Sequence, residues 1–413
     1  MLTLAAAKAA GRYGHVIFPQ ATHLPAIRLA ERLIHDGPGA GWASRAYFSD
    51  DGSTGMEVAL KMALRAFSKR EGWRKRVDPE LGVLGLKGSY HGDTIGAMDA
   101  CEEGIFTCEW HNAKGYWLDP PTVGIRTGRV QVTLPQTMLA HGDATTQFDS
   151  VSALYDVENR LQSPLADQYR QSIHESLSRI QRPGRPRPAA LVIEPLVMGA
   201  GGMVFVDPLF QRILVDAVRT HGKQDYRDRN PVEWHGMPVI FDEVFVGLYR
   251  IGMRTCSSLL GVTPDIAVYA KILTGGLVPM ALTLASDSIY QAFMGETKAE
   301  ALLHGHSYTA HPIGCEVANE TLDQLEKLSK SDDWVLARSN WQTSRTSLTS
   351  QEAPSTVWSF WDATFVIELS MNPKIEEVMT LGTVLAFKLR DNAGGTFTPA
   401  KATVRLSDGF TLS

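Results

Sequence analysis

Residues 265–276 read Asp-Ile-Ala-Val-Tyr-Ala-Lys-Ile-Leu-Thr-Gly-Gly, an apolar run that ends in Lys271 and is followed by a glycine pair. The apolar run predicts a buried strand, and the glycines predict a turn soon after it. An enzyme that needs an amine without its proton would place a lysine at such a strand end. Lys271 is therefore the first candidate catalytic residue.

Other segments show the same pattern of short apolar strands that alternate with helices. Strands that are apolar throughout are typical of a parallel sheet covered by helices on both faces. The expected fold class is therefore α/β, with a mostly parallel central sheet flanked by helices. Strands are predicted at 44–49, 81–86, 189–194, 238–242 and 265–270, and helices at 54–68 and 208–219.

Three charged residues fall at the carboxyl ends of predicted strands: Glu194, Asp242 and Lys271. In open α/β sheets, ligands bind beyond the carboxyl ends of the strands. We therefore expect these three side chains to converge on one crevice.

Composition narrows the classes of partner. With 413 residues, 44% of them hydrophobic, the chain can bury one large domain and a smaller one. A net charge of -5 without long runs of like charge gives no reason to expect nucleic acid. No apolar stretch reaches the roughly 18 residues of a membrane span. Small-molecule partners are expected, and four cysteines without metal or disulfide spacing favour a reducing compartment.

Three segments interrupt the regular order. Residues 104–147 are rich in Gly, Pro and Thr and are predicted to be a surface insertion, and 181–188 a turn-rich connector. Residues 1–30 carry basic but no acidic residues, a bias shared by organelle transit peptides. The amphipathic helical pattern that continues from Leu24 favours instead a segment that belongs to the fold.

A second candidate site lies at 50–55, Asp-Asp-Gly-Ser-Thr-Gly, between a predicted strand and helix. Gly52 allows close backbone approach, Ser53 offers a hydroxyl, and the helix start offers free N–H groups, which together suit a phosphate. Ordinary N-capping of the helix by Ser53 or Thr54 explains the same residues.

Asp242 and Lys271 add an acid and an amine to the helix start at 50–55. A buried carboxylate needs a partner, and the cationic ring nitrogen of a cofactor would serve, although Asp242 would equally suit a cap on the next loop. A desolvated Lys271 would be nucleophilic towards a carbonyl and form a Schiff base. Amine, acid and helix start are the three groups that pyridoxal 5'-phosphate requires.

The chain resembles the class III, fold type I aminotransferases, and within them the 7,8-diaminopelargonic acid (adenosylmethionine-8-amino-7-oxononanoate) aminotransferases of biotin synthesis. The resemblance covers about residues 2–325. Residues 117–122 and the His306-Ser307 pair are similar to the eukaryotic branch, in which this domain follows a dethiobiotin synthetase that is not in this chain. The matching segments are 52–64, Gly-Ser-Tyr-His-Gly-Asp-Thr-Ile-Gly-Ala-Met at 88–98, Glu-Pro-Leu-Val-Met-Gly-Ala-Gly-Gly-Met at 194–203, Phe-Asp-Glu-Val at 241–244, Lys-Ile-Leu-Thr-Gly-Gly at 271–276, and Leu-His-Gly-His-Ser-Tyr-Thr-Ala-His-Pro at 303–312.

The resemblance implies roles for most of these residues. Lys271 would hold the cofactor and move the substrate proton, and Asp242 would keep the pyridine nitrogen protonated. Tyr90 would stack on one ring face and touch the substrate, and Val244 would pack on the other face. Gly52 and Ser53 would hold the phosphate.

The same resemblance implies a homodimer with shared active sites. Ser307, with His306, would reach the phosphate of the other subunit, and Gly305 would border the substrate.

Plainer explanations exist for several of these residues. Tyr90 and His91 would also fit a packed aromatic and a satisfied core histidine. His304, His306 and His311 lie close in sequence, but no acidic or cysteine ligand spacing accompanies them, so no metal is expected. Glu194 would support the site from behind or neutralise an arginine, and Asp93 would organise a loop.

Two departures from the family affect the substrate pocket. The N-terminal family segment, which carries a tryptophan pair, is expected to be missing, and no Trp-Trp pair occurs here. The late substrate-binding arginine has no counterpart, since Arg405 lies outside the motif, and Val246 and Ile251 stand where relatives carry threonine. The expected domains are 1–325, the large cofactor-binding domain, and 326–413, a partial small C-terminal domain.

The expected reaction converts 8-amino-7-oxononanoate to 7,8-diaminononanoate, with S-adenosylmethionine as amino donor. Two alternatives remain: another class III enzyme such as an ornithine or other ω-aminotransferase, or a truncated, catalytically silent form that only binds cofactor or dimerises. The resemblance suggests mitochondria, and a cytoplasmic location is the alternative.

Overall fold

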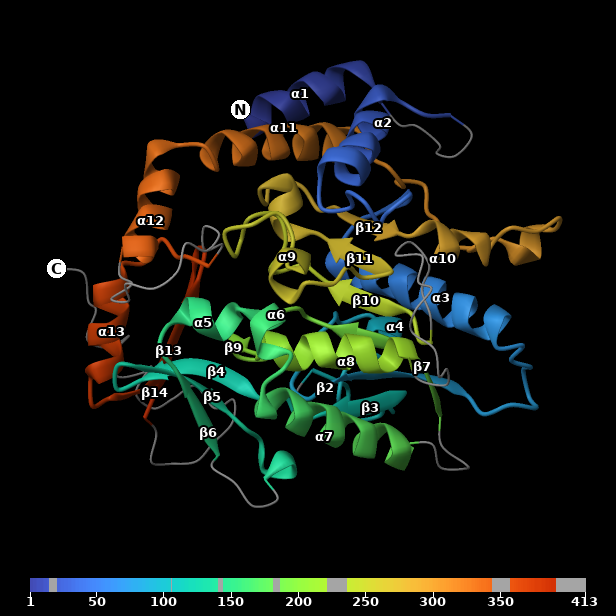
Figure 1. Ribbon diagram of the computed structural model, residues 1–413. Helices are drawn as coiled ribbons and strands as arrows, with labels where there is room; N and C mark the ends of the chain where they lie inside the picture. Colours follow the sequence, from blue (N-terminus) through green and yellow to red (C-terminus); the bar gives the residue numbers. More distant parts are fainter. Residues whose placement is uncertain are drawn as a thin grey trace.

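The computed structural model describes residues 1–14, 21–104, 106–139, 144–180, 186–220, 236–343 and 357–390. Its largest element is a seven-stranded sheet near the middle of the molecule (Figure 1). The order across this sheet is β1 (Arg45–Ser49), β12 (Ala281–Ala285), β11 (Ile266–Tyr269), β10 (Val239–Asp242), β7 (Arg187–Ile193), β2 (Leu81–Leu86) and β3 (Gly115–Leu118).

The sheet is mostly parallel, which confirms the predicted α/β class. The neighbours from β11 through β10, β7 and β2 to β3 all pair in parallel. Only β12 runs the other way, against both β11 and β1. All five predicted strands are present within two residues of their expected ends, because each is a short apolar run bounded by polar or turn residues.

Helices cover both faces of this sheet. Helix α3 (Gly52–Arg70) packs on the face to which Val192, Ile240 and Val268 point. Helices α7 (Pro164–Ile180) and α8 (Pro208–Thr220) belong to the core of the opposite face, which the neighbouring strand residues line, among them Ile193, Phe241 and Ala267. Successive strand side chains point to opposite faces of the sheet. A strand that is apolar throughout therefore contributes side chains to the hydrophobic cores on both faces.

Helices that are far apart in the sequence lie together at one side of the sheet (Figure 1). Helix α1 (Leu2–Arg12) and helix α2 (Leu24–Glu31) both contact α11 (Pro312–Leu328). Residues 2–12 and 24–31 therefore belong to the packed fold, as the amphipathic pattern predicted.

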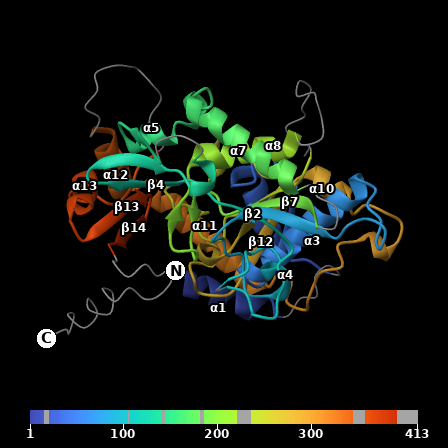
Figure 2. The same cartoon turned by 90° about the horizontal axis from the view of Figure 1, so that it is seen from below.

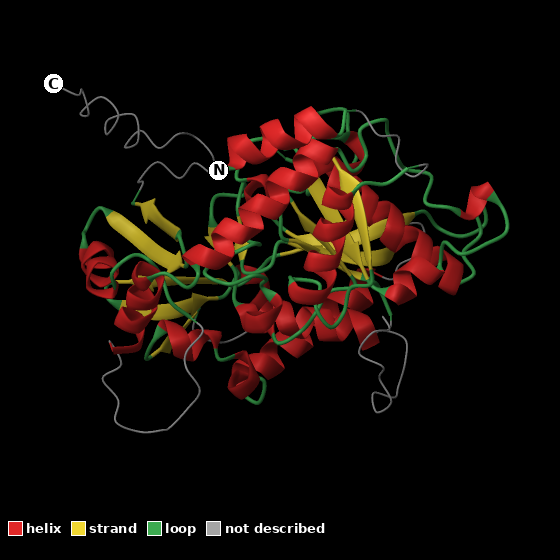
Figure 3. Ribbon diagram, turned by 90° about the horizontal axis from the view of Figure 1, so that it is seen from above, coloured by secondary structure: helices red, strands yellow, loops and turns green. Residues whose placement is uncertain are grey.

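A second, five-stranded sheet lies beside the main one, and the two groups of strands are separate in Figures 2 and 3. Helices α12 (Asp332–Thr343) and α13 (Ala363–Met371) lie at this side of the molecule (Figure 1). The order of the strands is β14 (Val384–Leu389), β13 (Ile375–Leu381), β4 (Thr122–Arg126), β5 (Arg129–Thr133) and β6 (Thr145–Phe148).

The remaining short elements connect these layers. They include α4 (Ile95–Met98), α5 (Val151–Tyr155), α6 (Val157–Arg160), α9 (Ser257–Leu260), α10 (Asp287–Gln291), and the two-stranded pair β8 (Val197–Met198) and β9 (Val204–Phe205). In the described part of the chain, no helix is long and apolar enough to cross a bilayer.

The prediction that 104–147 is a surface insertion was wrong. This segment supplies β3, an edge strand of the main sheet, and three strands of the second sheet. Val123, Ile125 and Val132 are buried in the core. The strands are only four or five residues long and are separated by Gly, Pro and Thr. The alternation of apolar and polar residues within each strand is therefore too short to recognise in the sequence.

Strands from both sides of residue 325 share the second sheet, since β13 pairs with β4. A division at 325 thus separates strands that are hydrogen-bonded to each other, and the two-domain division stays a prediction. Residues 181–185 of the predicted connector and Arg405 lie outside the described residues.

Replacing Ile125 by alanine tests the corrected role of β4. Ile125 is 1% exposed, so Ile125→Ala leaves a cavity and is expected to lower the free energy of unfolding by about 2–5 kcal/mol in urea denaturation. Thr145→Ala, on the exposed surface of β6, is the control and should change it by less than about 0.5 kcal/mol. If both variants changed the free energy of unfolding by the same small amount, residues 104–147 would be a surface insertion after all.

Candidate active site

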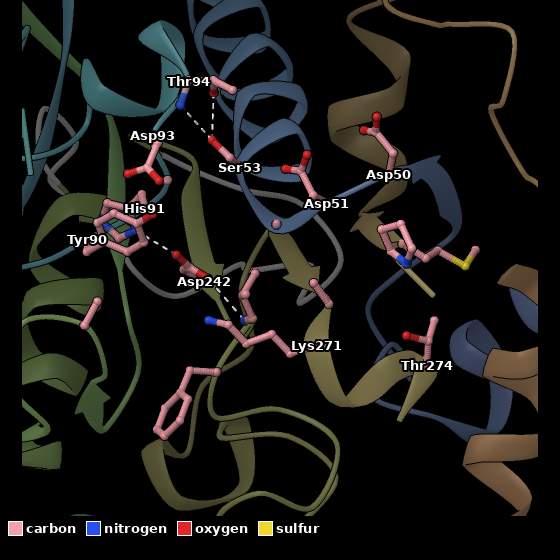
Figure 4. Close-up of a pocket in the computed structure, with 18 of the residues that line it drawn as sticks. Asp50, Asp51, Ser53, Tyr90, His91, Asp93, Thr94, Asp242, Lys271 and Thr274 are labelled. Atoms are coloured by element: carbon pink, nitrogen blue, oxygen red, sulfur yellow. Dashed lines mark hydrogen bonds and ion pairs between the residues drawn. The ribbon is translucent and has the colours of Figure 1, made fainter. Parts of the chain in front are cut away.

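A pocket of about 660 Å³ opens at the carboxyl ends of the parallel strands. Glu194 follows β7, Asp242 ends β10, and Lys271 follows β11, and all three line this pocket. Their predicted convergence is therefore confirmed, because parallel strands bring their carboxyl ends to the same edge. Figure 4 shows Lys271 extending towards the space beside Asp242 and Tyr90.

Lys271 begins a turn of 3-10 helix, Lys271–Thr274, directly beyond β11. Its φ is +47°, in the left-handed region that costs a non-glycine residue roughly 1–2 kcal/mol. The side chain is exposed to the pocket, with Nζ 5.9 Å from the centre of the Phe245 ring. Within the described residues nothing forms a hydrogen bond or ion pair with this amine. The expectation of a desolvated lysine was therefore wrong for the protein alone.

Asp242 has a partner that the sequence did not reveal. It is 5% exposed, and its Oδ2 lies 2.8 Å from Nδ1 of His91, which is 2% exposed. The backbone N–H of Val244 donates to the other carboxylate oxygen at 3.1 Å, so Asp242 also caps the loop that follows it. His91 Nε2 is buried and has no partner in the described chain, so His91 is only half satisfied as a core histidine.

Glu194 lies behind Tyr90 as a buried carboxylate. Its two oxygens accept hydrogen bonds from the backbone N–H groups of Tyr90 (3.0 Å) and Gly199 (2.9 Å). Burial, together with the charge of Asp242, raises the pKa of Glu194 to about 7. No arginine pairs with it in the described part of the chain, so the suggestion that it neutralises an arginine was wrong.

The charge of His91 depends on opposing effects. Burial alone would lower its pKa, but the hydrogen bond to Asp242 and the charges of Asp242 and Glu194 raise it overall. The imidazole of His91 therefore holds a proton more readily than burial alone would allow, and its Nδ1 lies beside the Asp242 carboxylate at the base of the pocket.

The start of α3 forms another wall of the pocket. Asp51, rather than Ser53 or Thr54, is the N-cap: it accepts from the backbone N–H of Thr54 at 2.9 Å, and the Thr54 hydroxyl accepts from Asp51 N–H at 3.2 Å. The alternative of capping by Ser53 was therefore wrong. Ser53 instead accepts from Thr94 N–H at 3.0 Å, and the two hydroxyl oxygens are 2.7 Å apart.

Two N–H groups of α3, those of Gly52 and Ser53, have no acceptor within the described residues. Both residues line the pocket. A Cβ on Gly52 would lie 3.0 Å from Val244, so only glycine leaves the backbone accessible here without displacing that side chain. This helix start can therefore receive an anion.

Tyr90 lines the pocket from the loop after β2. Burial and the nearby Asp93 carboxylate raise its pKa to about 12, so its hydroxyl remains protonated. Its ring packs against Phe106, with centroids 5.1 Å apart.

Gly305, His306 and Ser307 are not among the residues that line this pocket. His306 Nε2 lies 3.8 Å from a carboxylate oxygen of Asp50, a residue at the pocket wall. The Tyr47 hydroxyl donates to the carbonyl of His304, next to Gly305. Their assignment to the site of a second subunit stays a prediction.

Other candidates are placed away from the pocket wall. Val246 and Ile251 are buried in the core and do not line the pocket. Among the described residues, no group of three or more His, Cys, Asp or Glu side chains is arranged to hold a metal ion. The guanidinium of Arg250, which the motifs did not single out, lies 5.4 Å from the ring of Phe245, and Phe245 lines the pocket.

Comparison with known proteins extends these observations. Residues 1–115 and 127–352 match the family model described as aminotransferase class-III. The bifunctional dethiobiotin synthetase/adenosylmethionine-8-amino-7-oxononanoate aminotransferase of Emericella nidulans is 44% identical over 412 residues, 97% of this chain and 51% of that protein. The mitochondrial bifunctional dethiobiotin synthetase/7,8-diamino-pelargonic acid aminotransferase of Oryza sativa is 41% identical, over 92% of this chain and 44% of that protein. The chain thus spans about half the length of these relatives.

Solved structures agree with the fold. An amine transaminase from an uncultivated Pseudomonas species, in its PLP-bound form, has a TM-score of 0.67 at 23% identity, covering 95% of this chain and 72% of that one. The adenosylmethionine-8-amino-7-oxononanoate aminotransferase of Methanocaldococcus jannaschii has a TM-score of 0.64 at 20% identity, covering 94% and 70%. At these identities the likeness shows a shared fold type I architecture.

The buried acids and histidine predict how stability depends on pH. Folded Glu194, Glu243 and His91 all have raised pKa values, so the folded state binds more protons than the unfolded state between about pH 5 and pH 7. The free energy of unfolding, measured by urea denaturation, should therefore fall as the pH rises through this window.

Glu194→Gln removes the contribution of Glu194 and should make the fall between about pH 5 and pH 7 shallower, while Glu243 and His91 still contribute. Glu175→Gln, on the exposed surface of α7, is the control and should keep the slope of the unmodified protein. A stability that rises over this window would contradict the assigned pKa directions.

Proposed function

The chain belongs to the class III aminotransferases, and from this premise we propose that it moves an amino group onto 8-amino-7-oxononanoate to give 7,8-diaminononanoate, with S-adenosylmethionine as the donor. Pyridoxal 5'-phosphate is the cofactor. The observation that carries the proposal is that an amine, an acid and a helix start meet in one pocket, as this cofactor requires.

The residues present fit this cofactor. Its phosphate suits the unpaired N–H groups of Gly52 and Ser53, since the absence of a Cβ on Gly52 leaves the backbone accessible. Lys271 would hold its aldehyde carbon, and Asp242 would face its ring nitrogen. When bound, pyridoxal phosphate draws into its ring the electron pair that the substrate carbon releases on losing a proton.

Side chains of the protein would move the protons and orient the cofactor ring. Asp242, which is hydrogen-bonded to His91, would hold a proton on the ring nitrogen. Lys271 has no competing ion pair in the described structure, so its amine is free to take a proton from the substrate carbon and return it. Tyr90 and Val244 would lie on the two ring faces, and Tyr90 would also touch the substrate.

The substrate assignment rests on the relatives. The Emericella nidulans and Oryza sativa proteins carry this activity in their names, together with a synthetase activity, and this chain matches about half of each. No arginine lines the pocket within the described residues. Arg250, stacked on Phe245 at the pocket wall, would supply the positive charge for a substrate carboxylate.

The partner and the compartment follow from the same family. A second copy of the chain would complete the site with Ser307 and His306 and place Gly305 beside the substrate. The Oryza sativa relative is named as mitochondrial, and a mitochondrial location is proposed for this chain.

Lys271→Ala tests the cofactor assignment. Protein incubated with pyridoxal phosphate and then desalted should retain visible absorbance, and the variant should lose it, because the amine that holds the cofactor is gone. Lys327→Ala, an exposed lysine on α11, should retain the absorbance. Desalted wild-type protein without any bound cofactor would refute the assignment.

Turnover distinguishes the proposed reaction from its alternatives. Mass spectrometry should detect 7,8-diaminononanoate when the loaded protein is given S-adenosylmethionine and 8-amino-7-oxononanoate. Product from ornithine or another amine donor, with the biotin precursor untouched, would identify a different class III enzyme. Bound cofactor without turnover of any donor would identify a silent form.

Mixing two inactive variants tests the shared site. Lys271→Ala and Ser307→Asp protomers, unfolded and refolded together in equal amounts, should regain about a quarter of wild-type activity, since half of the dimers would carry one intact site. Each variant refolded alone is the control. Activity no higher in the mixture than in the controls would place Ser307 outside the partner's site.

A further inference from the structure

We propose that Glu243, with the hydroxyls of Tyr269 and Thr255, is a positioning residue that sets Asp242 and Lys271 at a fixed distance for the cofactor. The inference rests on the proposed function, because it assumes that these two groups hold the same molecule. Glu243 touches neither the pocket nor the reacting atoms and acts through its neighbours.

Glu243 is a buried carboxylate, 1% exposed, directly after Asp242. The Thr255 hydroxyl donates to its Oε1 at 2.5 Å and the Tyr269 hydroxyl to the same oxygen at 2.9 Å. The backbone N–H of Cys256 donates to its Oε2 at 3.1 Å. One side chain thereby joins the end of β10, the loop that returns at 255–256, and the end of β11.

The register of the sheet shows what this contact adds. Asp242 is paired with Val268, and this is the last pair between β10 and β11. Glu243 and Tyr269 occupy the next position along both strands. Their side-chain hydrogen bond therefore continues the cross-strand link one residue beyond the backbone ladder, at the point where both strands deliver their functional groups.

Lys271 needs such a link because its backbone is strained. Two residues after Tyr269, its φ of +47° lies in a region that non-glycine residues adopt only when the surroundings enforce it. The Tyr269 ring also packs closely against the backbone of Gly247, where a Cβ would lie 2.8 Å from it. Tyr269 is thus fixed at its ring and at its hydroxyl.

Core stability alone does not account for Glu243. No lysine, arginine or histidine of the described chain forms an ion pair with it, and burial raises its pKa to about 6 despite its hydrogen bonds. Apolar side chains of similar size often stabilise a core as well as buried charges do. A carboxylate that ties three segments together beside Asp242 and Lys271 is better explained by the geometry it enforces.

Tyr269→Phe tests the proposal with the smallest possible change. Removing this hydroxyl should weaken the affinity for pyridoxal phosphate roughly tenfold, measured by titration of the visible absorbance. Thr255→Val, which removes the other hydroxyl, should act in the same direction.

Tyr169→Phe is the matched control. Tyr169 is equally buried and donates to the carboxylate of Asp207 at 2.8 Å, but it lies on α7, and neither residue lines the pocket. Both tyrosine variants should lower the midpoint of thermal unfolding, and only Tyr269→Phe should weaken cofactor binding. Equal cofactor affinities in the two variants would overturn the proposal and leave Glu243 a structural residue.

A measurement on cofactor-free protein separates this inference from the proposed function. Amide hydrogen exchange at 270–275 should be roughly tenfold faster in Tyr269→Phe than in wild type and unchanged in Tyr169→Phe. Unchanged exchange in Tyr269→Phe would overturn the positioning role. Failure of wild-type protein to bind pyridoxal phosphate, with exchange altered as expected, would instead refute the proposed function alone.

Discussion

The parallel pairing of β10 with β11 is the constraint on which the rest of the structure depends. It places Asp242 and Lys271 at neighbouring strand ends, and β7 adds Glu194 at the same edge. Residues from distant parts of the sequence meet only because these strands run in one direction. The two apolar cores on either face of the sheet, and the helices that cover them, hold that direction.

Two buried carboxylates and one buried histidine lie together at the base of the pocket. Asp242 is held by His91, and Glu194 is held by two backbone N–H groups, so two buried carboxylates lie close together around one imidazole. Burial and the charge of Asp242 raise the pKa of Glu194, and the two carboxylates raise the pKa of His91 against the effect of burial. Among the described residues that line the pocket, Lys271 is the one lysine, and it shares the pocket with the Asp242 carboxylate, which suits a ligand whose ring nitrogen carries a proton.

Most of the main sheet and part of the site could be predicted from the sequence. Apolar runs such as 81–86 and 239–241 identify strands because burial on both faces leaves no polar residue in them. The strands at 122–133 escaped prediction because they are short and lie between turn residues.

Asp51 was missed as the helix cap because Ser53 and Thr54 are equally good capping residues. The partnership of Asp242 with His91 joins residues that are 151 apart in sequence, and no local pattern records it. The roles of Tyr90, Val244, His306 and Ser307 came from the resemblance alone and remain to be tested.

The most direct measurement is to locate where the cofactor is attached. The protein is loaded with pyridoxal phosphate, treated with borohydride and digested, and the modified peptide is sequenced by mass spectrometry. We predict a pyridoxyl phosphate group on Lys271 and on no other lysine. A group on a different lysine, or no modified peptide from a loaded sample, would contradict it.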